Sequence, residues 1–138
     1  KPRGGIETLA NAMDVGNPSN LVRLQHLLGD FEHFKSTVRA FSVEDFEIEE
    51  AIVDCHQKYG IFLCPHTATA YSVWKHHLDQ VPFMLVATAD ASKFETVVEP
   101  LVKQKVLVPE TLAKMLEKKE QYSVIAQDPA ALKNAVLN

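Results

Sequence analysis

The fold is decided by residues 83–94, which read Phe-Met-Leu-Val-Ala-Thr-Ala-Asp-Ala-Ser-Lys-Phe. The first five residues are apolar on both faces of an extended chain, as in a central strand that is covered on two sides. Ser92 and Glu95 have the spacing of a capping box, which predicts that a helix begins there. The stretch therefore predicts a buried strand, a short loop and a helix.

Thr88 lies in the loop between this strand and this helix. In open α/β sheets, ligands bind beyond the carboxyl ends of the strands, and a hydroxyl at that place can donate to or accept from a ligand atom. The alternative is a threonine whose hydroxyl satisfies only the loop backbone. By its place in the expected fold, Thr88 is the candidate ligand-binding residue of the chain.

On either side of this stretch the pattern is mostly helical. Helices are expected over residues 21–28, 31–38, 43–59, 67–78, 93–102, 109–116 and 129–137, and further short strands over 61–63 and 122–126. Ser42 and Asp45 form a capping-box pair at the start of the helix over 43–59. The inner face of that helix is predicted to carry Ile48, Ala51, Ile52, Cys55 and Tyr59.

The order of these elements predicts a helix-rich α/β fold with few strands and an incomplete sheet, because two or three strands would leave sheet edges open. Residues 1–19 carry little periodicity and are expected to form an extended arm or loop, and residues 20–138 a single α/β domain. An arm of this length is unusual in a compact domain. Since the chain also begins at Lys1 without a methionine, we expect it to be a fragment of a larger protein.

The composition is ordinary for a soluble globular chain, with 46% hydrophobic and 23% charged residues. The net charge of −4 gives no reason to expect nucleic acid or an anionic membrane surface as a partner. No apolar run reaches the 18 or so residues that span a bilayer. The two cysteines, Cys55 and Cys64, are too few for a disulfide scaffold and are expected to be buried, reduced thiols of a cytosolic protein.

The histidines and cysteines do not predict a metal site. His76 and His77 are adjacent, so their side chains point about 100° apart on a helix. Cys64 and His66 make a single pair and lack the second pair that zinc prefers. We therefore expect no metal ion in this chain.

Three blocks of the chain carry a resemblance to a known family. They are residues 8–20, 64–71 and 87–94, which read TLANAMDVGNPSN, CPHTATAY and ATADASKF. In this order they resemble the last third of the threonine synthase family of the bacterial and fungal kind. There the second block commonly reads Glu/Asp-Pro-His-x-Ala-x-Ala and the third Gly-Thr-Ala-His-Pro-Ala-Lys-Phe. The resemblance covers nearly the whole chain and implies the carboxy-terminal part of the large domain that binds pyridoxal phosphate (PLP), in the fold type of the tryptophan synthase beta chain.

The resemblance implies a cytoplasmic lyase that converts O-phosphohomoserine and water to L-threonine and phosphate with PLP as its cofactor. Thr88 matches the threonine that touches the pyridine nitrogen of PLP in this fold type, so it is the cofactor-binding residue that the resemblance implies. His66 matches the histidine of the second block, where a structural role at the helix start is as good an interpretation as a chemical one. No catalytic residue is assigned within this chain.

The chain departs from the family pattern at three positions. Asp90 stands where the family has histidine, Ala91 where it has proline, and Cys64 where it has an acid. The family's Schiff-base lysine and its glycine-rich cup for the PLP phosphate lie upstream of the part that this chain resembles. We therefore expect the isolated fragment to be inactive and not to bind PLP tightly.

Two other functions stay open at this point. A threonine-synthase-like phospholyase would keep the fold but eliminate phosphate without making threonine. A non-catalytic α/β binding module would use the same elements without any reaction. If the chain is a fragment, the apolar segment over 83–87 lacks its neighbours, so we expect self-association or a compact re-packing around this segment.

Overall fold

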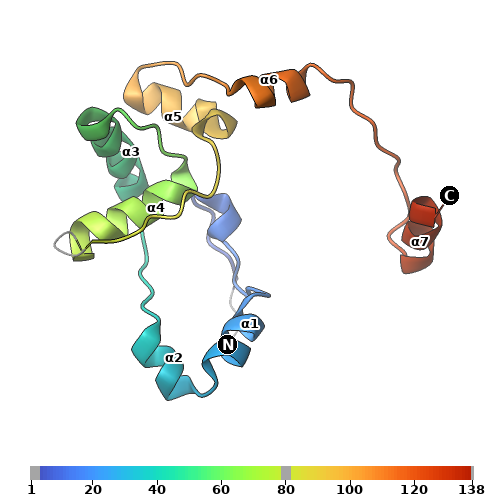
Figure 1. Cartoon of the computed structure of the whole chain (residues 1–138), viewed down its shortest axis with the longest axis horizontal. Coiled ribbons are helices and arrows are strands. Elements are labelled where there is room, and N and C mark those ends of the chain that lie inside the picture. Colours follow the sequence, from blue (N-terminus) through green and yellow to red (C-terminus); the bar gives the residue numbers. More distant parts are fainter. Residues whose placement is uncertain (1–3, 79–81, 138) are drawn as a thin grey trace. The chain divides into compact units, whose positions relative to one another are not determined.

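The structure is a computed structural model that describes residues 4–78 and 82–137. Over these residues the backbone forms helices joined by turns and extended segments (Figure 1). The elements are η1 (Asn11–Met13), α1 (Leu21–Leu28), α2 (Phe31–Thr37), α3 (Asp45–Tyr59), α4 (Pro65–Val73), η2 (Trp74–Leu78), η3 (Ala91–Phe94), α5 (Glu95–Val102), α6 (Glu110–Leu116) and α7 (Pro129–Leu137). Here η1 and η3 are 3₁₀ turns, and η2 continues α4 as a π-helix.

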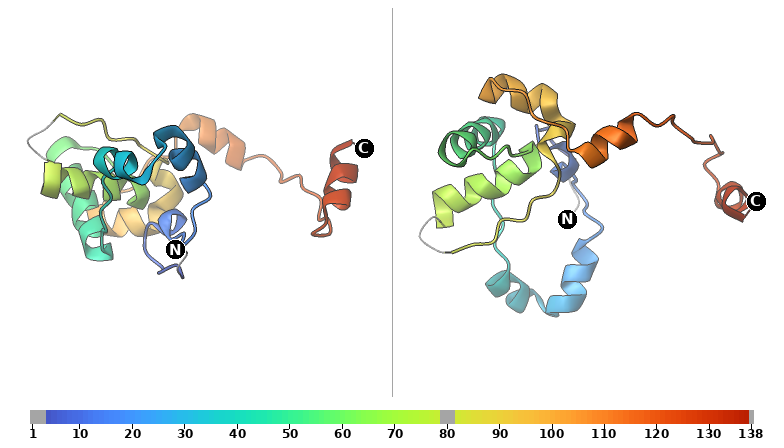
Figure 2. Two further views of the ribbon diagram at one scale, coloured as in Figure 1. Left: turned by 90° about the horizontal axis from the view of Figure 1, so that it is seen from below. Right: turned by 45° about the horizontal axis from the view of Figure 1, so that its top comes forward.

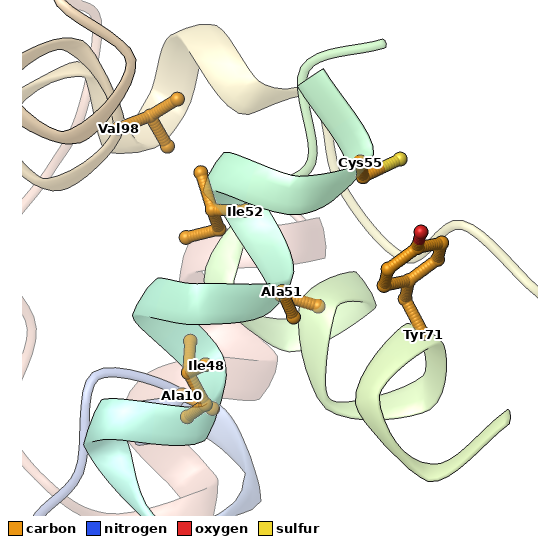
Figure 3. Packing of buried hydrophobic residues seen from close by; sticks show 8 residues of the cluster. Ala10, Ile48, Ala51, Ile52, Cys55, Tyr71 and Val98 are labelled. Carbon is orange, nitrogen blue, oxygen red and sulfur yellow. The ribbon is translucent and has the colours of Figure 1, made fainter. Parts of the chain in front are cut away.

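The core is built on one face of α3. Ile48 and Ile52 are fully buried, and Ile52 faces Val98 of α5, while Ala51 and Cys55 lie on the side of α4 and its Tyr71 (Figure 3). Figure 2 shows α3, α4 and α5 lying together in both further views, and α3 contacts both α4 and α5. Each large aliphatic side chain buried in this way contributes about 1.5–3 kcal/mol.

The ends of α3 explain its length. Glu44 is the residue before the helix, and its N–H donates to Glu47 Oε2 at 2.7 Å, as in a capping box. The expected pair of Ser42 and Asp45 is therefore wrong, because the helix begins two residues later than predicted. At the other end Gly60 has a φ of 68°, a left-handed conformation that ends a helix and favours glycine.

The predicted strands are corrected by the structure. Residues 61–63, 83–87 and 122–126 have no regular secondary structure, and no strand forms anywhere in residues 4–78 and 82–137. A strand needs a neighbour that exchanges backbone hydrogen bonds with it, and these segments do not pair with one another. The side chains of Met84 and Val86 are 89% and 68% exposed. The fold class over the described residues is therefore helical, and the helix-rich part of the prediction is confirmed.

The chain forms two compact units, Lys1–Leu107 and Val108–Asn138. The expected arm over 1–19 and the single domain over 20–138 stay a prediction. Residues 1–3 of the expected arm lie outside the described residues. The described part joins the core, because Ala10 is buried in it and the Leu9 N–H donates to Asp45 Oδ1 at 2.9 Å.

The second unit holds α6 and α7 and buries none of its helical side chains. Asp128 caps α7 as expected, since its carboxylate accepts from the N–H groups of Ala130 and Ala131. Each helix in the described ranges is too short or too polar to span a bilayer.

A polar cluster fastens α4 to α3 beside the core. Tyr71 Oη donates to Asp54 Oδ2 at 2.7 Å, and the ammonium groups of Lys58 and Lys75 lie 2.9 Å and 3.3 Å from Asp54 Oδ1. The hydrogen bond from Tyr71 is the largest cause that lowers the pKa of Asp54. Burial opposes it and the two lysines add to it, and together they bring this pKa to about 2 from the ordinary 3.8.

Asp54 should make the stability of the fold sensitive to acid. Because its pKa is lower in the folded chain, the ionised carboxylate stabilises the fold above pH ~4, and this contribution is lost as the pH falls from about 4 towards 2. The shift corresponds to about 2 kcal/mol. We expect Asp54→Asn to lower the free energy of unfolding at pH 7 by about that amount and to flatten its pH dependence in this window.

Urea unfolding at a series of pH values measures both effects. Glu49→Gln, which removes an exposed carboxylate from the same helix, is the control and should keep the wild-type pH dependence. If the free energy of unfolding of Asp54→Asn falls between pH 4 and pH 2 as steeply as that of the wild type, another group causes the acid sensitivity.

Candidate functional site

The candidate site begins at the first turn of α4. Cys64 precedes the helix in an extended conformation, and its sulfur accepts from the Thr67 N–H at 3.5 Å. Pro65 follows at the first helical position, where its missing N–H costs nothing. Cys64 thus caps the helix, the role that an acid at this position can also fill. The side chain is only 1% exposed, so the cap is sealed from water.

Thr88 reaches this turn from the extended segment 82–88, which runs back along α4 in Figures 1 and 2. Its N–H donates to Thr67 Oγ1 at 3.2 Å. Its Oγ1 lies 3.4 Å from Thr67 Oγ1 and 3.8 Å from Cys64 Sγ. We call these three side chains the Cys64–Thr67–Thr88 cluster. Cys64 and Thr67 are buried and Thr88 is exposed, so Thr88 connects the buried pair to the surface.

The cluster changes the acidity of the Cys64 thiol. Burial acts to raise the pKa of this thiol and is the largest single cause. Hydrogen bonds from the Thr67 hydroxyl and N–H, from the Thr88 hydroxyl and from the Ala89 N–H act in the other direction and prevail, so the pKa is lowered. Cys55, by contrast, has a raised pKa, because burial and the charge of Asp54 both disfavour its thiolate. Both cysteines are free and buried, as the sequence predicted.

The thiol and the two hydroxyls of the cluster can form hydrogen bonds as neutral groups. Within residues 4–78 and 82–137, the polar partners of Thr88 are Cys64 and Thr67. It can therefore offer its hydroxyl proton to a neutral acceptor atom, such as an unprotonated ring nitrogen. No group of three or more His, Cys, Asp or Glu side chains within residues 4–78 and 82–137 is placed to hold a metal ion.

His66 is buried beside the cluster but bonds elsewhere. Its Nε2 accepts from the Ala12 N–H at 3.0 Å, and its ring lies 4.9 Å from the ring of Phe94. Nδ1 is buried and has no hydrogen-bond partner among the described residues. The contacts of His66 therefore join η1 to α4 and η3, which agrees with the structural interpretation of this residue.

Asp90 caps η3 on the other side of Thr88. Its Oδ1 accepts from the Ser92 N–H at 2.9 Å and from the Ser92 hydroxyl at 2.6 Å, and these two bonds are the largest causes that lower the pKa of Asp90. Ser92 was expected to cap this helical region, but Asp90 does so. An aspartate at this position orders the backbone just after the cluster.

An apolar hollow of about 640 Å³ lies beside the cluster. It is bounded by α3, α4 and the segment 82–87, and Thr67 is among its few polar lining residues. Most of the other lining side chains are aromatic or aliphatic, for example Trp74, Phe83 and Leu85. Phe83, Leu85 and Ala87 line the hollow, whereas Met84 and Val86, which alternate with them, are exposed and do not line it.

Comparison with known proteins identifies the region. The family model described as "Threonine synthase, C-terminal" matches residues 67–136. The threonine synthase of Buchnera aphidicola subsp. Acyrthosiphon pisum is 30% identical over 117 residues, which cover 84% of this chain and 27% of that protein. This chain thus spans about a quarter of the length of that relative.

Solved structures share the fold. The crystal structure of threonine synthase from Escherichia coli matches with a TM-score of 0.72 at 24% identity, over 99% of this chain and 32% of the other. The PLP-bound threonine synthase from Brucella melitensis matches with a TM-score of 0.66 at 20% identity, over 99% of this chain and 35% of the other. The helical arrangement described above therefore occurs within larger proteins.

Proposed function

The chain belongs to the threonine synthase family, and on this basis we propose that it forms the carboxy-terminal part of a threonine synthase. The complete protein would convert O-phosphohomoserine and water to L-threonine and phosphate with PLP. The match of the family model over residues 67–136 is the observation that carries the proposal. Two free, buried cysteines support a cytoplasmic location, where thiols remain reduced.

Thr88 is the residue through which this chain would hold the cofactor. Its exposed hydroxyl lies beside a thiol and a second hydroxyl, which are both neutral, and it fits a neutral acceptor such as the pyridine nitrogen of PLP. A hydroxyl is a milder partner than a carboxylate, so it does not hold the ring nitrogen protonated. When bound, PLP supplies an electron sink for the reaction, and Thr88 would fix the orientation of its ring.

The rest of the proposed active site lies outside this chain. By the family resemblance, the Schiff-base lysine and the cup for the PLP phosphate precede the matched region. The extended segment 83–87 would then be a strand with neighbours from that preceding part, which would satisfy its free backbone groups and cover the side chains of Phe83, Met84 and Val86. The finer α/β description of the fold is part of this proposal.

The activity is tested on the longer protein that carries this chain. We expect it to release threonine and phosphate in equal amounts from O-phosphohomoserine when PLP is present, and the 138-residue chain alone to release neither. Phosphate without threonine would identify a phospholyase instead. Borohydride reduction of the isolated chain with PLP should leave no stoichiometric lysine adduct, and such an adduct would contradict the placement of the Schiff-base lysine in the preceding part.

Thr88→Val tests the cofactor contact in that longer protein. The change keeps the β-branched shape and the backbone N–H bond to Thr67, so the fold should lose no more than the ~0.5–1.5 kcal/mol of one hydrogen bond. We expect weaker PLP retention and turnover reduced at least about tenfold, which corresponds to ~1.4 kcal/mol in the barrier.

Thr69→Val is the matched control for this contact. The Thr69 hydroxyl donates within its own helix to the His66 carbonyl at 2.7 Å and lies 3.5 Å from Met13 Sδ, so its loss should leave PLP retention near the wild type. The measurements are PLP content after dialysis and turnover, made on both variants side by side. If Thr88→Val behaves no worse than Thr69→Val, Thr88 is only a loop threonine.

The open apolar side of segment 83–87 should make the isolated chain self-associate. Its exposed apolar side chains and the adjoining hollow form a surface that monomeric proteins usually cover. We expect sedimentation to show concentration-dependent dimers or larger species, and an apolar dye to bind. Met84→Lys with Val86→Lys, which places charge on the open side, should restore the monomer and abolish dye binding. A wild-type chain that is monomeric and binds no dye would contradict the proposal that the preceding part of the longer protein covers this apolar side.

A further inference from the structure

The Cys64–Thr67–Thr88 cluster contains a buried hydroxyl that has no role in the function proposed so far. Thr67 is 4% exposed and lies in the first turn of α4. Its Oγ1 is at once 3.2 Å from the Thr88 N, 3.4 Å from Thr88 Oγ1 and 3.3 Å from Cys64 Sγ. In the family pattern this residue corresponds to the open position x of the second block, so the resemblance gives it no role.

The protons of the cluster limit how its hydrogen bonds can run. The Thr88 N–H donates to Thr67 Oγ1, which leaves the Thr67 hydroxyl proton for either Cys64 Sγ or Thr88 Oγ1. When Thr88 directs its own proton outward to a ligand, its oxygen becomes an acceptor inside the cluster. The Thr67 hydroxyl is the buried donor that can satisfy it, and the Cys64 thiol can then donate to Thr67 Oγ1.

We propose that Thr67 is a positioning residue for the proposed cofactor contact: it anchors the backbone of Thr88 and turns the Thr88 hydroxyl proton outward, towards the ring nitrogen of PLP. The inference rests on the proposed function, because that function supplies the acceptor. Hydrogen bonds then run in one direction, from the Cys64 thiol to Thr67, from Thr67 to Thr88, and from Thr88 to the ligand.

Hydrogen bonds that run from position 64 to Thr67 and on to Thr88 require a donor at position 64. The Cys64 thiol can be this donor, whereas the ionised acid of the family pattern cannot. An ionised carboxylate only accepts hydrogen bonds, so it would draw the proton of Thr67 or of Thr88 towards itself. The neutral Cys64 thiol carries a proton and can donate weakly to Thr67 Oγ1, whereas its thiolate would accept from Thr67 and Thr88 as a carboxylate does. With a neutral thiol in this place, the proton of Thr67 is available to Thr88. The departure at position 64 is thus compatible with an outward-directed Thr88 hydroxyl.

The first test uses the 138-residue chain without cofactor and measures amide hydrogen exchange at Thr88. Thr67→Val removes the acceptor for the Thr88 N–H, so exchange at Thr88 should become at least about tenfold faster. Thr67→Ser restores a hydroxyl and should return the rate to near the wild type, and Thr69→Val should leave it unchanged. The amide of Ile52 reports on the core, and Thr67→Ala is measured beside Thr67→Val to exclude an effect of the added methyl group. Wild-type exchange at Thr88 in both variants would overturn the anchoring.

The second test uses the longer protein loaded with PLP that carries ¹⁵N in its ring, and reads the chemical shift of that nitrogen. Thr67→Val should move the resonance away from its hydrogen-bonded position in the same direction as Thr88→Val, and Thr67→Ser should restore it. If Thr88→Val moves the resonance and Thr67→Val does not, the positioning role is overturned while the proposed function stands. If neither variant moves it, the Thr88 contact itself is wrong and the outward direction of the hydroxyl is overturned with it, whatever the amide exchange shows.

Discussion

The burial of one face of α3 is the constraint on which the first unit depends. Ile48 and Ile52 are fully buried. The buried side chains that join them from outside α3 come from separate parts of the sequence: Ala10 from the amino-terminal segment, Ala68 and Tyr71 from α4, and Val98 from α5. None of these contributors can bury its own apolar side without α3, since most helical stability in proteins comes from such packing. The polar cluster around Asp54 then fixes α4 beside α3 at one position.

The candidate site inherits its geometry from this packing. The first turn of α4 holds Cys64 and Thr67 at its start and Ala68 in the core, so the same turn supplies the site and the fold. The segment that carries Thr88 has no strand partner in the described residues, and its bonds to Thr67 fix the position of its end. The side chain that we propose to hold a ligand, that of Thr88, is thus exposed, but the residues that hold it in place are buried. Precise sites on loops generally need such rigid support.

The sequence predicted the helices well because apolar residues recur in it with the period of 3.6 residues of a helix. Gly29 and Gly60 also mark where two helices end. It misplaced two caps, since Ser42 and Ser92 have the right spacing for a capping box, yet Glu44 and Asp90 make the bonds. The strands failed for a different reason. A strand forms only when a neighbouring segment exchanges backbone hydrogen bonds with it. The apolar residues over 83–87 indicate a segment that would be buried in a sheet, but they do not show that this chain contains the neighbouring strand.

Thr88 could be proposed from its place after an apolar segment, but Thr67 could not, and the difference is instructive. The sequence shows that Thr88 follows a candidate strand. Thr67 lies 21 residues earlier, and the two residues come close only because the segment 82–88 folds back on α4. One signal was present in the sequence: Thr67 stands three residues after Cys64, the position whose N–H a capping side chain contacts. That spacing places a hydroxyl next to the cap but does not say what else the hydroxyl meets. Because a buried hydroxyl left without a partner costs about 1–3 kcal/mol, a threonine in this place requires polar neighbours, and Cys64 and Thr88 are the neighbours that the fold provides.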